Sequence, residues 1–151
     1  MKFFSFKAWQ SEQLSLIEEE SKKYAEEFET IQSFINNDFL DVYYENHGFH
    51  DFCIKSIDFR DSHNIIIEIY RNKNNHFWST KKTYFIQYLN VTEFKINYWN
   101  SDKLPSMQIG RDIEWGYDEF SKDTNTLRHS ILTSSGKEIS ISFQNIGIVC
   151  A

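Results

Sequence analysis

The residues whose types and spacing could support chemistry begin with His47, His50 and Asp51. Two imidazoles and a carboxylate can ligate a transition metal, and a histidine beside an aspartate can act in acid–base catalysis. Gly48 permits a turn here, and Asp51 can cap the backbone amides of that turn. Capping is the simpler interpretation. His47, His50 and Asp51 are weak metal candidates, and His50 and Asp51 are weak catalytic candidates.

A second acidic group consists of Glu114, Asp118 and Glu119. In a regular strand Glu114 and Asp118 share one face, while Trp115 and Tyr117 point to the other face and into the core. A carboxylate pair could act as an acid and a base, but a solvated outer face explains these residues without chemistry, and we expect them to be exposed. The chain carries no nucleophile elbow, phosphate-binding loop or metalloprotease helix, and we expect no cofactor.

Aromatic residues supply two further candidate surfaces. Trp78 lies in a polar stretch between two predicted strands, where an exposed ring could anchor a protein partner. A curved sheet could also hold a small ligand in its mouth. We expect that ligand site to be lined by Tyr84, Tyr88, Tyr98 and Trp99.

The composition indicates a folded, acidic domain. Of the 151 residues, 40% are hydrophobic and 17% are aromatic, which is ample material for a core. Residues 1–46 hold ten acidic and four basic side chains, and residues 47–151 hold twelve of each, so the net charge of −6 lies on the N-terminal third. Such a field repels nucleic acid and anionic membranes and attracts a basic protein partner.

The chain has the features of a cytoplasmic protein. No apolar run approaches the roughly 20 residues of a membrane-spanning helix, and the apolar start, Met1–Phe6, is too short for a secretory signal. Two cysteines are too few for a disulfide framework. We expect Cys53 and Cys150 to be buried thiols, with a bridge between them as the alternative.

A single amphipathic helix is predicted to begin at Ser11 and to stop at residues 36–38, a length of about 25 residues. Its apolar stripe recurs at steps of three and four, through Leu14, Ile17, Ser21, Tyr24, Phe28, Ile31 and Ile35. The opposite face carries the expected partner-binding residues Glu12, Glu19, Glu20, Glu26 and Glu27. Packing on the protein's own sheet explains the stripe, and a partner helix is the alternative. Residues 39–44 predict a last helical turn or an irregular apolar segment.

From Cys53 onward, apolar residues alternate with polar ones as in β-strands. The predicted strands are 53–60, 65–70, 83–91, 94–99, 112–120, 126–133 and 137–143, with 146–149 as a final extended segment. Short turn-forming connections require antiparallel neighbours. We therefore predict one α+β domain, 1–151, helical over 1–46 and β over 47–151. One long N-terminal helix packs on a mostly antiparallel sheet of six or seven strands, which is a curved sheet, a sandwich or a partial barrel.

Three segments together resemble an uncharacterised family of small bacterial proteins. They are Met1-Lys2-Phe3-Phe4 with Trp9, Phe49-His50-Asp51 with Ile54 and Ile57, and Trp115-Gly116-Tyr117-Asp118-Glu119-Phe120 with Ile139-Ser140-Ile141. The resemblance implies no catalytic site. In size and layout the chain is also similar to small acidic proteins that act as cytoplasmic immunity factors beside secreted toxins.

The acidic helix and the lack of catalytic motifs favour a non-enzymatic protein-interaction protein, in its sharpest form an immunity protein that neutralises a basic toxin. The first alternative is a small-ligand binding module in the mouth of a curved sheet, and the second, less favoured alternative is a metal-dependent hydrolase. We expect a protein partner and neither nucleic acid nor membrane. The sequence specifies no oligomeric state.

Overall fold

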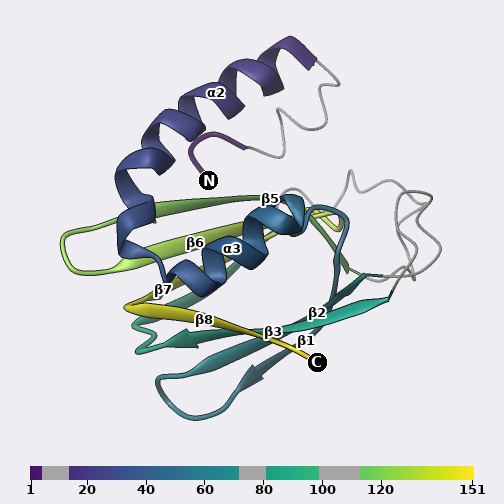
Figure 1. The fold of residues 1–151 in the computed structure, drawn as a ribbon, viewed down its shortest axis with the longest axis vertical. Helices are drawn as coiled ribbons and strands as arrows, with labels where there is room; N and C mark the ends of the chain where they lie inside the picture. The colour runs from purple at the N-terminus through teal and green to yellow at the C-terminus, as the bar shows by residue number, and fades with distance from the viewer. Residues whose placement is uncertain (5–13, 72–80, 99–112) are drawn as a thin grey trace.

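The structure is a computed structural model that describes residues 1–4, 14–71, 81–98 and 113–151 (Figure 1). Its helical elements are α2 (Leu14–Ile31), η1 (Gln32–Phe34), α3 (Asn37–Glu45) and η2 (His47–Phe49). Its strands are β1 (Cys53–Phe59), β2 (Ile65–Arg71), β3 (Lys82–Leu89), β4 (Glu93–Tyr98), β5 (Ile113–Lys122), β6 (Leu127–Thr133), β7 (Lys137–Phe143) and β8 (Asn145–Cys150).

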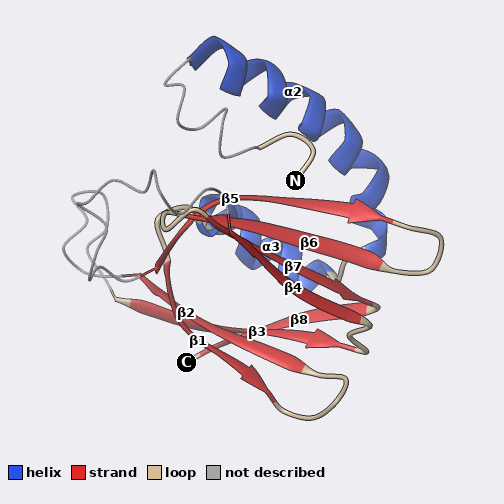
Figure 2. Cartoon of the chain, turned by 180° about the vertical axis from the view of Figure 1, so that it is seen from behind, coloured by secondary structure: helices blue, strands red, loops and turns tan. Residues whose placement is uncertain are grey.

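The eight strands form one open, curved sheet in the order β4-β7-β6-β5-β1-β2-β3-β8, and every neighbouring pair is antiparallel (Figure 2). The prediction of an α+β fold with an antiparallel sheet is therefore confirmed. The predicted number of six or seven strands is wrong. The final extended segment is a full strand, because β8 pairs with β3 from Leu89↔Asn145 to Tyr84↔Cys150.

The sheet is split near its middle. β5 pairs with β6 along most of its length, from Trp115↔Thr133 to Lys122↔Leu127. On its other side β5 pairs with β1 only at Cys53↔Glu114 and Ile54↔Ile113. Beyond that short joint β5 and β1 are not paired, and both α2 and η2 contact β5.

The predicted long amphipathic helix is present as α2, and a second helix, α3, follows it. α2 buries Tyr24, Phe28 and Ile31, as its apolar stripe predicts, and packs against β5. It ends at Ile31, five residues before the predicted stop, and η1 follows. The predicted start at Ser11 lies outside the described residues.

The residues expected to stop the helix instead start the next one. The Asn36 side-chain oxygen accepts hydrogen bonds from the amides of Asp38 (2.8 Å) and Phe39 (3.2 Å), which is an N-cap for α3. Residues 39–44, expected to be a helical turn or an irregular segment, lie within this helix, which packs against β8. Phe39 and Tyr43 point into the core.

The core is one aromatic-rich cluster shared by the helices and the sheet. Its largest fully buried side chains include Phe39, Phe49, Tyr88, Trp115 and Phe120. Among the described residues, no helix combines the length and the apolar character that crossing a bilayer requires.

Cys53 and Cys150 form no disulfide, so the alternative of a bridge between them is not realised. Cys53 is buried, as predicted, but Cys150 is exposed. The expectation that both are buried is wrong for Cys150, because β8 is an edge strand of the sheet and its last residues lie at the surface.

Candidate functional site

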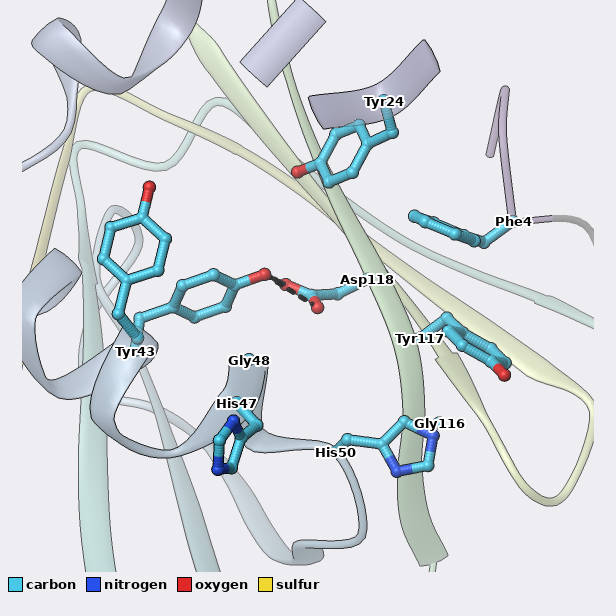
Figure 3. A pocket seen from close by; sticks show the side chains of 10 residues that line it. Phe4, Tyr24, Tyr43, His47, Gly48, His50, Gly116, Tyr117 and Asp118 are labelled. Carbon is cyan, nitrogen blue, oxygen red and sulfur yellow. Dashed lines mark hydrogen bonds between the residues drawn. The ribbon is translucent and has the colours of Figure 1, made fainter. Parts of the chain in front are cut away.

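A pocket of about 410 Å³ lies where the helical elements meet β5 beside the split in the sheet (Figure 3). Its lining residues come from five separate segments of the chain. They are Phe4, Tyr24 of α2, Tyr43 and Tyr44 of α3, His47, Gly48 and His50 around η2, and Gly116, Tyr117 and Asp118 of β5. The volume lies within the range of small-molecule binding sites.

Aromatic rings in mutual contact form one wall of the pocket. Phe4 stacks on Tyr117 with ring centroids 5.3 Å apart and meets Tyr24 edge-on at 5.4 Å. His50 continues the wall with an edge contact to Tyr117 at 5.3 Å. Across the pocket, Tyr43 and Tyr44 also meet edge-on, at 5.9 Å. These contacts hold the rings in place, so the pocket is a preformed feature.

Asp118 supplies the buried charge of the pocket. Its side chain lies in the middle of the lining residues, and the Tyr43 hydroxyl points at it (Figure 3). That hydroxyl donates to the carboxylate with 3.0 Å to each oxygen, and His129 Nε2 lies 2.6 Å from Oδ2. Asp118 is 7% exposed and His129 is fully buried. A buried carboxylate needs such donors, because leaving it without them costs several kcal/mol.

The hydrogen-bond network continues inward from His129 to Tyr88, whose hydroxyl lies 2.8 Å from Nδ1. Burial raises the pKa of Tyr43 and of Tyr88 well above the usual value, and the nearby Asp118 charge raises both further. Both tyrosines therefore stay protonated and act as donors. A neutral imidazole then satisfies both neighbours, since Nδ1 accepts from Tyr88 and Nε2–H donates to Asp118.

A tight turn at η2 brings the chain against the pocket. Gly48 has a φ of +68°, and a Cβ there would lie 3.2 Å from the Tyr43 hydroxyl oxygen. His47, Phe49 and Asp51 also adopt positive φ, which side chains rarely do. Such strain persists only where surrounding contacts impose it, and it gathers at functional sites.

Two backbone hydrogen bonds lock this turn to β5. The Asp51 amide donates to the Trp115 carbonyl at 3.0 Å, and the Trp115 amide donates to the Phe52 carbonyl at 2.7 Å. Farther along β5, the Phe120 amide donates to the Tyr24 hydroxyl at 2.6 Å. A side chain of α2 thus satisfies a backbone amide of β5, and the tyrosine is fixed at the pocket.

Two of the three metal candidates line this pocket. His47 and His50 lie at its rim, and His50 Nδ1 is 2.9 Å from Asp51 Oδ1 with both side chains about half exposed. Within the described ranges, no group of three histidine, cysteine or acidic side chains is arranged to hold a metal ion. Asp51 contributes its backbone amide to the junction with β5, and its carboxylate faces His50.

The expectation that the β5 acids form a solvated face is wrong for two of them. Glu114 is exposed, but Asp118 and Glu119 are buried. The reason is a β-bulge, since the pairing with β6 shifts between Trp115 and Tyr117. The extra residue reverses the alternation, so Asp118 points inward on the same face as Trp115.

Glu119 is buried on the other face of β5 by the start of the chain. Its carboxylate accepts hydrogen bonds from the backbone amides of Lys2, Phe3 (2.9 Å) and Phe4 (3.2 Å). These bonds hold residues 2–4 against β5 and place the Phe4 ring in the pocket wall.

The predicted ligand-lining tyrosines lie deeper than the pocket. Tyr84 is 3% exposed and accepts a hydrogen bond from Asn46, and Tyr88 is fully buried beside His129. Neither lines the pocket described above. The Tyr98 side chain, Trp99, Trp78 and Glu12 lie outside the described residues.

The acidic face of α2 is largely on the surface. Glu19 and Glu26 are exposed, while Glu20 and Glu27 are partly buried. Lys23 pairs with Glu19 at 2.8 Å and with Glu20 at 3.1 Å, both on the same helix. Lys2 pairs with Glu27 at 2.6 Å. The helix still carries six glutamates against two lysines.

Sequence reasoning did not single out Tyr24, Tyr43 or His129 as functional residues. Tyr24 belonged to an apolar stripe, Tyr43 to an apolar segment and His129 to a strand. One available signal was Gly116 inside a strand pattern, because an interior glycine often marks a bulge or a close backbone approach.

No protein-family model matches the sequence, and no curated protein matches it either. One solved structure is similar in fold, the crystal structure of an uncharacterized protein from Neisseria gonorrhoeae. The two chains share 17% sequence identity with a TM-score of 0.47, over 66% of this chain and 91% of that chain. This degree of likeness carries no argument about function.

Proposed function

We propose that the protein is a binding module that takes a small ligand into the pocket between α2, α3, η2 and β5. The observation that carries this proposal is the buried Asp118 carboxylate at the centre of a pocket of about 410 Å³ with aromatic walls. Ligand sites are concave, mostly apolar and supplied with a few convergent polar groups. This proposal takes up the alternative function predicted from the sequence, a small-ligand binding module, and places its site away from the predicted tyrosines.

The local backbone supports the same proposal. Positive φ at His47 and Phe49 costs conformational energy, of order 1–3 kcal/mol per residue. A structure that needed only a packed core could fill this space with side chains, whereas here Gly48 and Gly116 line it. The pocket is therefore a specific feature of this chain.

A fragment titration of the whole protein tests the proposal. Two-dimensional NMR spectra would be recorded with a set of small neutral, cationic and anionic fragments at millimolar concentration. We expect saturable shifts that cluster on the amides of residues 47–50 and 116–118. Shifts scattered over the surface, or none with any fragment, would overturn the proposal.

Two variants locate the binding. Tyr117→Leu removes part of the aromatic wall and should weaken fragment binding severalfold. Phe59→Leu is the matched control, because Phe59 is 60% exposed on β1 and contacts Phe94, away from the pocket. Equal binding by both variants would show that the fragments bind elsewhere.

A second candidate function is binding of a basic protein partner by the outer face of α2, in its sharpest form immunity toward a basic toxin. The supporting observation is that α2 packs its apolar stripe on β5 and leaves Glu18, Glu19, Glu26 and Glu29 exposed. Its excess of four negative charges would steer a cationic partner toward this face.

Charge reversal in α2 tests this second function with a basic protein as the partner. Glu19→Lys with Glu26→Lys should lower the association rate about tenfold at low salt and flatten its salt dependence. Glu114→Lys is the control, because Glu114 is exposed on β5. An association rate that is indifferent to the double reversal would contradict the proposed role of α2.

A further inference from the structure

We propose that the ligand of the pocket is a small organic cation, with an ammonium or methylated ammonium group placed beside Asp118. This inference rests on the proposed function and names the chemical class of its ligand. It depends on three arguments, which are the negative sign of the buried charge, the aromatic walls of the pocket and the poorer fit of anionic and neutral ligands.

The buried charge is negative and lacks a cationic neighbour in the lining. Asp118 is the only acidic residue among the described residues of the lining, which include no lysine or arginine. Its hydrogen-bond donors are a tyrosine hydroxyl and an imidazole. One neutral tautomer of His129 can accept from Tyr88 at Nδ1 and donate to Asp118 from Nε2, so these hydrogen bonds do not require a cation beside Asp118. A cation in the pocket would compensate that charge.

The walls suit a cation as well. Five aromatic side chains of phenylalanine or tyrosine line the space, and aromatic faces attract ammonium groups, most strongly where water is excluded. Phe4, Tyr24 and Tyr117 are held by their mutual contacts. Their arrangement around a buried carboxylate resembles the aromatic cages that bind quaternary ammonium ions.

The other ligand classes fit less well. An anion would approach the buried Asp118 carboxylate, and the repulsion between like charges is strong in a partly desolvated site. The rim histidines His47 and His50 could attract an anion only when protonated, and His50 already faces the Asp51 carboxylate. A neutral ligand would gain contact with the rings but would leave the charge of Asp118 uncompensated.

A matched series of three probes tests the inference on the whole protein. The probes are choline, its neutral isostere in which a carbon atom replaces the quaternary nitrogen, and the anion pivalate. Choline and its neutral isostere share the branched head group and the hydroxyethyl arm, so they differ mainly in charge, whereas pivalate carries a carboxylate on the same tert-butyl group as the isostere. We expect choline to bind about tenfold more tightly than the neutral isostere and pivalate to bind least, with shifts at residues 116–118.

Two variants identify the groups responsible. Asp118→Asn should weaken choline binding about tenfold and leave the neutral isostere unchanged. Because Asp118 also holds Tyr43 and His129, Tyr117→Leu provides a second variant that does not touch this network, and it should also weaken choline more than the isostere. Phe59→Leu should change neither.

The outcomes separate the two proposals. Equal binding of choline and its isostere, or preference for pivalate, would overturn the cationic ligand and leave the pocket as a binding site. Binding of neutral fragments without any binding of choline would have the same meaning. If neither choline nor any fragment perturbs the pocket amides, both proposals fail.

Discussion

The hydroxyl of Tyr43 allows a sharp test of the buried network, because Tyr44 beside it provides a control of the same chemistry. Tyr43→Phe removes the donor to both Asp118 oxygens, 3.0 Å away. The ring remains in place and keeps its stacking on Phe39 at 5.6 Å. The change therefore removes a hydrogen bond without opening a large cavity.

The expected loss follows from burial and charge. Tyr43 is 8% exposed and Asp118 is 7% exposed. A hydrogen bond to a charged group contributes about 1.5–3 kcal/mol, and the carboxylate keeps its bond to His129. We expect Tyr43→Phe to lower the free energy of unfolding by about 2 kcal/mol. Tyr44 is 52% exposed and its hydroxyl donates to Gln32 at the surface, so Tyr44→Phe should cost no more than about 0.5 kcal/mol.

Urea unfolding followed by circular dichroism measures both variants. Tyr43→Phe should lower the urea concentration at the midpoint and leave unchanged the slope of the unfolding free energy against urea concentration. That combination marks a loss of stability in one cooperative unit. Equal midpoints for Tyr43→Phe and Tyr44→Phe would refute the reasoning, because the Asp118 carboxylate would then not depend on this donor.

Two further predictions concern pH and the start of the chain. Burial raises the pKa of three buried tyrosines well above the usual value of 10.0, namely Tyr24, Tyr43 and Tyr88, and it also raises that of the more exposed Tyr44. Their contribution to stability is complete below that value and is lost as the pH rises above it, since the unfolded state releases these protons first. Urea midpoints should therefore fall steeply above about pH 10, because the unfolded state then binds up to about three protons fewer at these tyrosines than the folded state does. Urea midpoints that stay constant above about pH 10 would contradict the burial of these hydroxyls. Glu119→Ala should free the amides of Phe3 and Phe4, so their hydrogen exchange should accelerate at least tenfold while amides in β7 are unchanged. Unchanged exchange at Phe3 and Phe4 would show that Glu119 does not hold this segment.

The sequence by itself determined the local structure, because helix and strand periods depend on near neighbours. The stripe through Tyr24, Phe28 and Ile31 predicted the buried face of α2. Alternation from Cys53 onward predicted the positions of all eight extended segments, including the last one. Short connections then required antiparallel pairing of consecutive strands, and the pairs β1–β2, β5–β6 and β6–β7 have it.

Local patterns did not decide where helices break or where a strand shifts its register. Asn36 is equally suited to end one helix or to cap the next, and it caps α3 because the chain turns there to place Phe39 and Tyr43 against the sheet. The bulge at Gly116 reverses the faces of β5 and buries Asp118, which a regular strand would leave in solvent.

The pocket is the feature that only the tertiary structure decided. Its lining residues are separated by as many as 114 positions in the sequence, from Phe4 to Asp118, and they meet only because β1 leaves β5 after a short joint. The charge of the N-terminal third is fixed by composition, whereas a buried carboxylate acquires its role from the donors around it. Those donors are Tyr43 of a helix and His129 of a neighbouring strand. No local spacing in the sequence predicts that both contact Asp118.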